Sequence, residues 1–288
     1  MNEVCVSVQQ MQNIEYNILK FIKGVCEKNN LHYYLAYGTL IGAVRHNGFI
    51  PWDDDIDILM PRNDYEKFVK AVEAENHPYY KLVSKETEEN FTAPLPKVID
   101  SRIELVQNYS FIEKVILGPY VDLFILDGCG ESEEQASNHF ETCYKVFKKW
   151  LIADTNFSKT ANRFTALLKR ILYFPIKKKG YESFLHDLST ECTAYSYEKS
   201  SYVGTLMFPS TNGNNKKSEF LGNVWSKKYF GEGVELAFED EKFTVPVSYK
   251  EMLSTWYGNF MELPPEEQQL PHHKYTLRIP DGLDLENI

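Results

Sequence analysis

Two spacings of apolar residues alternate along this 288-residue chain and predict a mixture of helices and strands. Apolar residues recur every three or four positions from Val8 to Val25, which is the period of an amphipathic helix, so we expect a helix over residues 7–29. The same spacing predicts further helices over residues 63–74, 131–151 and 249–257.

Shorter runs, in which side chains alternate between two faces, predict strands. In the run Asp55–Met60, Asp55 and Asp57 share one face while Ile56, Ile58 and Met60 share the other. In Tyr120–Leu126, Asp122 lies opposite a buried apolar face, and Asp127 beyond it reads as a turn residue beside Gly128. Other strand candidates are 33–37, 81–84, the pair 96–99 and 103–107 with a hairpin turn at 101–102, and the hairpin 235–238 with 242–245.

Four of the five residues from Asp53 to Asp57 are aspartates, and apolar residues follow directly. Same-face residues on a strand lie roughly 6–7 Å apart, and two carboxylates at that distance repel by about 2–3 kcal/mol at an effective dielectric near 20. A hard divalent cation with oxygen ligands would remove this repulsion. We therefore expect Mg²⁺, or Mn²⁺ in its place, bound to Asp55 and Asp57.

Just upstream, the short apolar run at 33–37 ends at Gly38, and Thr39 precedes an apolar helical pattern. Thr is a good helix N-cap, and glycine lets a ligand approach the backbone. The unpaired amides of a first helical turn bind phosphate. A phosphate site at Gly38 and Thr39 is thus expected to face the metal site.

The stretch GTLIGAVRHNGFIPWDDDIDI, residues 38–58, resembles the hallmark stretch of the LicD family of phosphocholine transferases, to which fukutin and fukutin-related protein are similar. The resemblance spans residues 31–68. Two weaker matches are YVDLFILDG at 120–128 and YGNFMELPPEEQQLPHH at 257–273. This family has a nucleotidyltransferase-like fold.

The resemblance implies an α+β architecture, with a nucleotidyltransferase-like mixed sheet flanked by helices and an additional, mostly helical part. Residues 1–130 would form the catalytic core, and residues 131–288 a helical, acceptor-side extension packed on the same domain. Asp122 would be a third metal ligand or would activate the acceptor hydroxyl, and His272 and His273 would contact phosphate or act as a general base. The residues expected at the donor are Gly38, Thr39, Arg45, Trp52 and Asp53.

The implied activity is Mg²⁺-dependent transfer of phosphocholine, or a similar phospho-alcohol, from CDP-choline or a related CDP-alcohol, with release of CMP. The acceptor would be a sugar hydroxyl of a cell-surface glycan, such as a lipid-linked teichoic acid, lipopolysaccharide or capsule precursor. Two alternatives stay open. The same carboxylates could transfer a nucleoside monophosphate and release pyrophosphate, or the fold could be an inactive nucleotide- or sugar-binding module.

Composition narrows these possibilities. A formal charge of −10 argues against nucleic acid as a partner. Five cysteines without a C-x-x-C pair indicate neither a disulfide framework nor a zinc site. No apolar run approaches the roughly 18 residues that span a bilayer, so we expect a cytoplasmic protein.

One segment reverses the charge of the chain. Between Lys159 and Tyr181 there are seven Lys or Arg residues and no Asp or Glu. Apolar residues cover one arc of a helix over 159–179, while Lys159, Arg163, Arg170 and Lys177 share the other. This helix could contact the inner face of the plasma membrane peripherally, or it could be a core helix with a solvated basic face.

Overall fold

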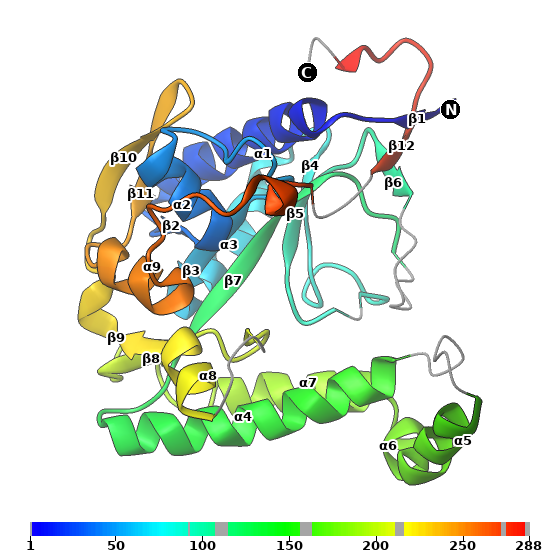
Figure 1. Cartoon of the computed structure of the whole chain (residues 1–288), viewed down its shortest axis with the longest axis vertical. Coiled ribbons are helices and arrows are strands. Elements are labelled where there is room, and N and C mark those ends of the chain that lie inside the picture. Colours follow the sequence, from blue (N-terminus) through cyan, green and yellow to red (C-terminus); the bar gives the residue numbers. More distant parts are fainter. Residues whose placement is uncertain are drawn as a thin grey trace.

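The computed structural model of the chain describes residues 2–91, 93–106, 115–155, 163–210, 216–271 and 275–285. Its centre is a mixed sheet with the strand order β2-β3-β7-β5-β4, extended at β7 by β8 and β9 (Figure 1). Strands β3 and β7 are parallel, and their other partners in this sheet are antiparallel. The bounds are β2 Tyr34–Leu35, β3 Asp57–Pro61, β4 Tyr80–Val83, β5 Lys97–Asp100, β7 Tyr120–Gly128, β8 Tyr202–Gly204 and β9 Val224–Ser226.

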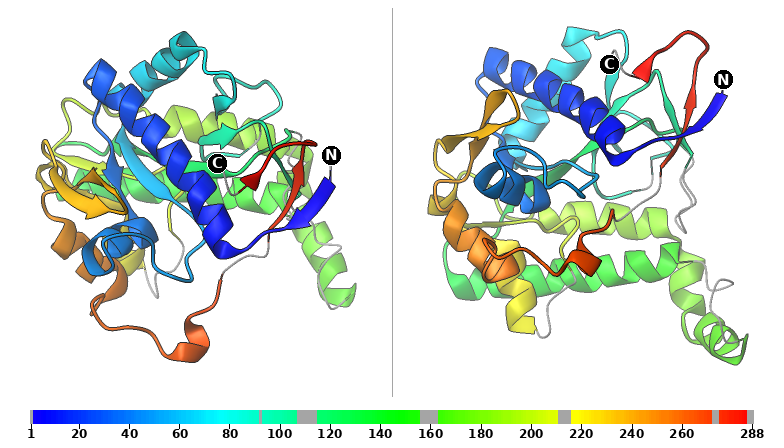
Figure 2. Two further views of the ribbon diagram at one scale, coloured as in Figure 1. Left: turned by 90° about the horizontal axis from the view of Figure 1, so that it is seen from above. Right: turned by 45° about the horizontal axis from the view of Figure 1, so that its top comes forward.

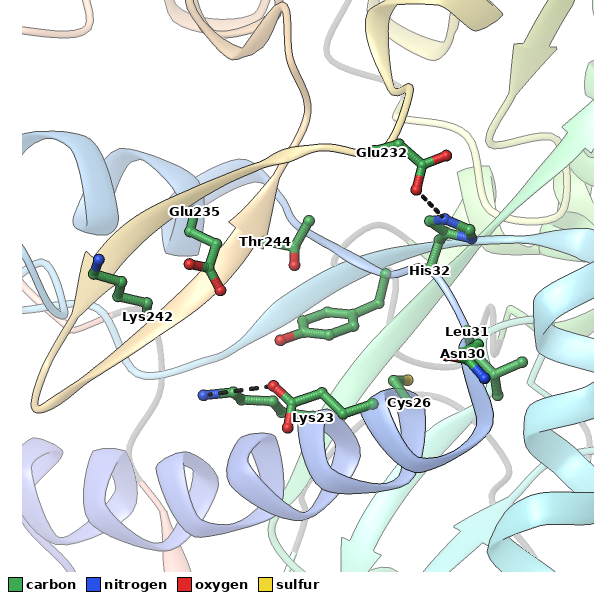
Figure 3. A pocket seen from close by; sticks show the side chains of 11 residues that line it. Lys23, Cys26, Asn30, Leu31, His32, Glu232, Glu235, Lys242 and Thr244 are labelled. Atoms are coloured by element: carbon green, nitrogen blue, oxygen red, sulfur yellow. Dashed lines mark hydrogen bonds and ion pairs between the residues drawn. The ribbon is translucent and has the colours of Figure 1, made fainter.

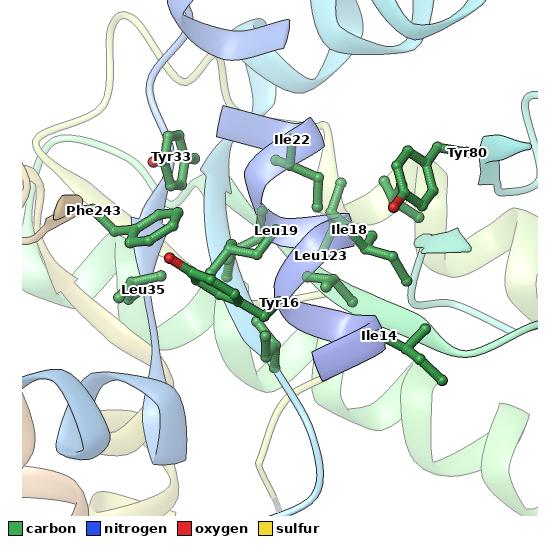
Figure 4. Close-up of a cluster of buried hydrophobic side chains, with 14 of the residues drawn as sticks. Ile14, Tyr16, Ile18, Leu19, Ile22, Tyr33, Leu35, Tyr80, Leu123 and Phe243 are labelled. Carbon is green, nitrogen blue, oxygen red and sulfur yellow. The ribbon is translucent and has the colours of Figure 1, made fainter. Parts of the chain in front are cut away.

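Helix α1, Val8–Asn29, covers one face of this sheet and confirms the predicted helix over residues 7–29. Ser7 caps it, because Ser7 Oγ accepts from the amide of Gln10 while the Gln10 side chain accepts from the amide of Ser7. Figure 4 shows apolar side chains of α1 packed around Leu123 of β7. Helices α2, Tyr37–Arg45, and α3, Arg62–Glu75, flank the same sheet. The predicted α+β architecture, a mixed sheet flanked by helices, is confirmed.

A second, three-stranded sheet brings the two ends of the chain together (Figure 2). It consists of β1 Asn2–Cys5, β12 Thr276–Ile279 and β6 Glu104–Val106. The predicted hairpin of 96–99 with 103–107 is therefore wrong, because β5 pairs with β4 and β7 while β6 pairs with β12. The buried Asp100 redirects the chain here, since its carboxylate accepts from the backbone and the guanidinium of Arg102.

The other predicted hairpin is confirmed by β10, Val234–Phe238, and β11, Glu241–Val245. A pocket of about 300 Å³ lies between this hairpin, the C-terminal half of α1 and the residues before β2 (Figure 3). Charged groups of its lining pair with one another: His32 Nε2 lies 3.2 Å from Glu232, and Lys23 Nζ lies 3.9 Å from Glu27. The aspartates singled out in the sequence do not line it.

Helices α4, Glu133–Asp154, and α7, Tyr181–Cys192, lie side by side beneath the main sheet in the view of Figure 1. They enclose a second buried apolar cluster that includes Phe140, Phe147, Trp150, Leu185 and Leu188. Helix α8, Lys216–Asn223, contacts helix α9, Tyr249–Tyr257, which also contacts α2. No helix in the described ranges has both the length and the apolar character needed to cross a bilayer.

The predicted single helix over 159–179 is two helices where the structure describes it, α5 Arg163–Leu172 and α6 Phe174–Lys179. Pro175 lacks an amide hydrogen and stands in the first turn of α6, so the ladder of α5 cannot continue through it. Lys177 does not face solvent as expected, because its ammonium donates to the carbonyls of Ala153 and Thr155 at the end of α4. Residues 159–162 lie outside the described ranges.

Candidate active site

Three polar side chains form a row across the main sheet. The parallel register places Asp57 of β3 opposite Asp122 of β7, and the antiparallel register places Asp122 opposite Lys97 of β5. Lys97 Nζ lies 2.5 Å from Asp122 Oδ1. Strand β3 starts at Asp57, two residues later than the predicted start at Asp55. Asp57 is therefore its first residue, and Asp55 lies in the loop before it.

The loop before β3 adds three more carboxylates to this edge of the sheet. Asp53, Asp54 and Asp55 each offer an oxygen, and these oxygens lie within 4.8 Å of one another. Gln12 of α1 holds the loop, since its side-chain amide donates to the carbonyl of Asp53 at 2.8 Å. Asp54 is completely buried, and Asp55 is partly exposed.

A sixth carboxylate, which the sequence analysis did not select, comes from α1. Glu15 is 1% exposed, and its Oε2 has no hydrogen-bond partner among the described residues. Burial raises its pKa well above the ordinary value, and the charges of Asp55 and Asp54 raise it further. The available signal was a Glu on the apolar face of the helix, one residue after Ile14.

The pKa values show how costly this concentration of charge is. Burial raises the pKa of Asp53 to about 8, with Asp55 as the next cause. Burial and then Asp55 and Asp122 raise the pKa of Asp57 well above its ordinary value. Burial also raises the pKa of Asp122, although Lys97 acts in the opposite direction.

These residues fit a divalent cation. Six carboxylates gather at one edge of the sheet, three of them buried and three half-buried, and one ammonium bonds to one of them. Hard oxygen ligands of this kind suit Mg²⁺ or Mn²⁺. The predicted set of Asp55, Asp57 and Asp122 stays a prediction, as does the choice among the neighbouring Asp53, Asp54 and Glu15.

Helix α2 begins earlier than the predicted turn at Gly38 and Thr39. Its first residue is Tyr37 and its N-cap is Ala36. Thr39 therefore does not cap the helix; its hydroxyl accepts a hydrogen bond from the amide of Asp57 at 2.9 Å and ties α2 to β3. Position 38 requires glycine for a steric reason, because any Cβ there would collide with the carboxylate of Asp53.

The remaining predicted site residues lie at different places. Arg45 Nη1 donates to the carbonyl of Phe260 at 2.8 Å and joins α2 to the segment after α9. Trp52 is half-buried and packs edge-on to His46, with ring centroids 6.3 Å apart. Donor binding by Arg45 and Trp52 stays a prediction, and His272 and His273 lie outside the described residues.

Asp127 is not the turn residue that was predicted. It lies inside β7 and is 1% exposed. Arg62 of α3 meets its carboxylate with two hydrogen bonds, Nε to Oδ1 at 2.7 Å and Nη2 to Oδ2 at 3.1 Å. This bidentate pair holds α3 on β7, so we assign Asp127 a structural role and do not count it among the carboxylates around Asp55.

Three aromatic rings adjoin the carboxylates. Phe124 shares a strand face with Asp122, and its ring centroid lies 4.9 Å from that of Tyr37. Tyr37 also contacts Trp256 of α9, with ring centroids 4.6 Å apart. These three half-buried rings form the aromatic group of the site.

Comparison with known proteins gives this geometry a context. Residues 30–124 match the nucleotidyltransferase domain of the LicD/FKTN/FKRP family. Over 279 residues, 93% of this chain and 96% of the relative, the chain is 30% identical to the lipopolysaccharide cholinephosphotransferase LicD of Haemophilus influenzae. Over 39 residues, 14% of this chain and 8% of the relative, it is 44% identical to human ribitol 5-phosphate transferase FKRP.

Proposed function

The chain belongs to the LicD family, and we propose that it transfers phosphocholine from CDP-choline, or a similar group from a related CDP-alcohol, to a sugar hydroxyl of a cell-surface glycan such as lipopolysaccharide. The observation that carries this proposal is the match to a cholinephosphotransferase over nearly the whole of both chains. In the reaction, the bond from the transferred phosphorus to the CMP oxygen breaks. A bond to the sugar oxygen forms, and the hydroxyl proton goes to a base.

The carboxylate edge of the sheet supports phosphoryl transfer. A bound Mg²⁺ or Mn²⁺ would offset the charge of the donor diphosphate and of the leaving CMP. Asp55, Asp57 and Asp122 are the proposed ligands, and all three are half-exposed. Since little covalent chemistry falls to the protein, positioning and electrostatics provide most of the rate enhancement.

Lys97 and Asp122 suggest how the acceptor proton is handled. The ammonium of Lys97 lies 2.5 Å from Asp122 and favours the ionised form of this carboxylate, which opposes the larger effect of burial on its pKa. A charged Asp122 can accept the hydroxyl proton as a general base or can ligate the cation. Both roles need the carboxylate in its ionised form, so Lys97 serves either one as a positioning residue.

The aromatic group supports a choline headgroup. Quaternary ammonium ions bind to the faces of aromatic rings, and Tyr37, Phe124 and Trp256 lie together beside the carboxylates. A ribitol or glycerol phosphate has no cation for these rings to attract. The group therefore favours choline over the uncharged alcohols as the transferred alcohol.

Product analysis tests the proposal. Purified protein is incubated with Mg²⁺, a glycan acceptor and, in parallel, CDP-choline, CDP-ribitol, CDP-glycerol or CTP. We expect CMP and a phosphocholine-modified glycan from CDP-choline. Release of pyrophosphate from CTP with a nucleotidylated product would instead establish the nucleotidyltransferase alternative, and an absence of turnover with all four would favour a binding module.

A further inference from the structure

The helical pair α5 and α6, residues 163–179, carries apolar side chains on its outside. Five large apolar residues within eight positions are more than half exposed: Leu167 54%, Leu168 51%, Ile171 67%, Leu172 70% and Phe174 63%. At about 100° per residue, the four of them in α5 fall within an arc of about 140°. Contiguous apolar surface of this kind marks an interaction site more often than single exposed residues do.

The base of this arm is fixed to the rest of the protein. Ile176 of α6 packs against the second apolar cluster between α4 and α7. Lys177 donates to the carbonyls of Ala153 and Thr155, which end α4. Helix α6 thus joins the arm to the rest of the protein, and α5 contacts α6.

The charge of the arm selects the kind of partner. From Arg163 to Gly180 there are six Lys or Arg residues and no Asp or Glu, although the whole chain has a formal charge of −10. Lys169 and Lys178 are exposed next to the apolar arc, and Lys179 forms an ion pair with Asp187 at 2.5 Å. An apolar stripe flanked by cations matches an anionic bilayer, where acyl chains meet negative headgroups.

The shape of the arm agrees with a flat partner. In Figures 1 and 2, α5 and α6 stand out beyond the end of α4 from every side shown. A projecting helix can enter a membrane interface without the rest of the molecule interfering. A second copy of the chain fits less well, because a symmetric contact through this face would bring two sets of six cations together.

We propose that α5 and α6 form a docking surface for anionic membranes, with Leu168, Ile171 and Leu172 entering the acyl boundary and Lys169 and Lys178 contacting the headgroups. The inference does not rest on the proposed function, because binding to lipid needs neither donor nor acceptor. It would place the enzyme beside lipid-linked glycans.

Vesicle flotation tests the docking surface. The full chain is mixed with vesicles of phosphatidylcholine alone or with an equal part of phosphatidylglycerol, and the floating fraction is measured. The apolar variant is Leu168→Gln with Ile171→Gln and Leu172→Gln. Each lost apolar side chain is expected to weaken partitioning by about tenfold or more, so the triple variant should not float with either vesicle.

The charge variant is Lys169→Glu with Lys178→Glu, and its matched control is Lys70→Glu with Lys228→Glu, two exposed lysines on other elements. Losing each basic contact weakens binding to anionic vesicles by about fivefold, and reversing the charge weakens it further. The control should float like the wild type. Because exposed charges are screened within about 3 Å at 1 M salt, high salt should reduce the floating fraction of the wild type.

Several outcomes would overturn the inference. The wild type could fail to float with anionic vesicles, or the apolar variant could float as well as the wild type. Sedimentation equilibrium distinguishes the rival partner: a wild-type dimer that the apolar variant converts to a monomer, without any vesicle binding, would assign the face to a second copy. Circular dichroism verifies that the variants are folded, as expected for exposed positions.

Discussion

The carboxylate edge of the main sheet and the arm of α5 and α6 depart from ordinary folding preferences in opposite ways. The first holds charge inside the protein, where Glu15 and Asp54 are at most 1% exposed. The second holds apolar side chains outside, with Ile171 and Leu172 at about two-thirds exposure. Both arrangements are unfavourable in the isolated chain. We propose a ligand of matching chemistry for each, a cation for the carboxylates and a lipid surface for the arm.

The largest effect is expected at the carboxylates of the proposed cation site, compared with a carboxylate that is paired with an Arg. Asp57→Asn should reduce turnover by about a thousandfold or more, because a lost ligand or charge at the reacting phosphate costs several kcal/mol. Its free energy of unfolding without metal should stay equal or rise, since one repulsive charge disappears. Asp55→Asn should behave in the same way. Turnover at a tenfold range of metal concentrations and the melting temperature are measured together.

Asp127→Asn is the control, because Asp127 is a buried carboxylate that is paired with Arg62. Removing one partner of a buried pair leaves an uncompensated charge and should lower the free energy of unfolding by about 3 kcal/mol. Wild-type turnover in Asp57→Asn would contradict a role for Asp57 in the reaction. A loss of stability as large as in Asp127→Asn would show that Asp57 has a structural role like that of Asp127.

Glu15→Gln should have the next largest effect. If Glu15 supports the cation, turnover falls by about ten- to a hundredfold and the affinity for Mn²⁺ alone, measured by titration calorimetry, falls with it. The metal-free protein should become more stable, because a neutral amide of similar shape replaces a buried carboxyl group whose ionised form burial and the charge of Asp55 disfavour. Glu27→Gln, at an exposed position of the same helix, is the control. An unchanged Mn²⁺ affinity in Glu15→Gln would contradict the role.

The sequence predicted those parts of the molecule that depend on local pattern. Helix α1 and the strands β3 and β7 follow from periodicity over a few residues, whereas the family resemblance implied that Asp122 lies with Asp57. Glu15 could not be recognised in this way, because its neighbours in the site come from 38 or more residues later in the chain. Partners set by tertiary packing leave no mark on local spacing.

The same reason explains the other errors. The interpretation of Asp127 as a turn residue failed because Arg62, its partner, is 65 positions away. The hairpin of β5 with β6 failed because β12, from the end of the chain, takes β6 into another sheet. In the arm, local signals did predict the amphipathic pattern, whereas the division before Pro175 and the bonds of Lys177 to the end of α4 appeared only in the structure.

A smaller effect is expected at the aromatic group. Phe124→Leu keeps an apolar side chain but removes a ring face, so the KM for CDP-choline should rise by about tenfold with little change in kcat. Activity with CDP-ribitol, if any, should change little, because ribitol has no cation. Phe21→Leu, a half-buried ring that packs against His77 and Tyr80, is the control for general loss of aromatic packing. Equal changes with both donors would remove Phe124 from choline recognition.

The smallest effect concerns the pH dependence of stability, which separates the carboxylate edge from the arm because lysines and apolar side chains do not titrate near neutrality. The pKa of Asp53 is about 8 in the folded protein, mainly through burial, and lies near 3.8 when the group is unperturbed. The folded state therefore binds a proton that the unfolded state releases, and stability from this group is lost as pH rises from about 4 to 8.

Without metal, the wild type should lose about 1 kcal/mol or more between pH 6 and pH 8 relative to Asp53→Asn, measured by urea unfolding at each pH. Saturating Mg²⁺ with CDP-choline should reduce this difference, because a bound cation favours the ionised carboxylate. If the free energies of unfolding of the wild type and Asp53→Asn changed equally with pH in the absence of metal, the charges at this edge would already be compensated in the protein alone. That outcome would contradict the proposed cation.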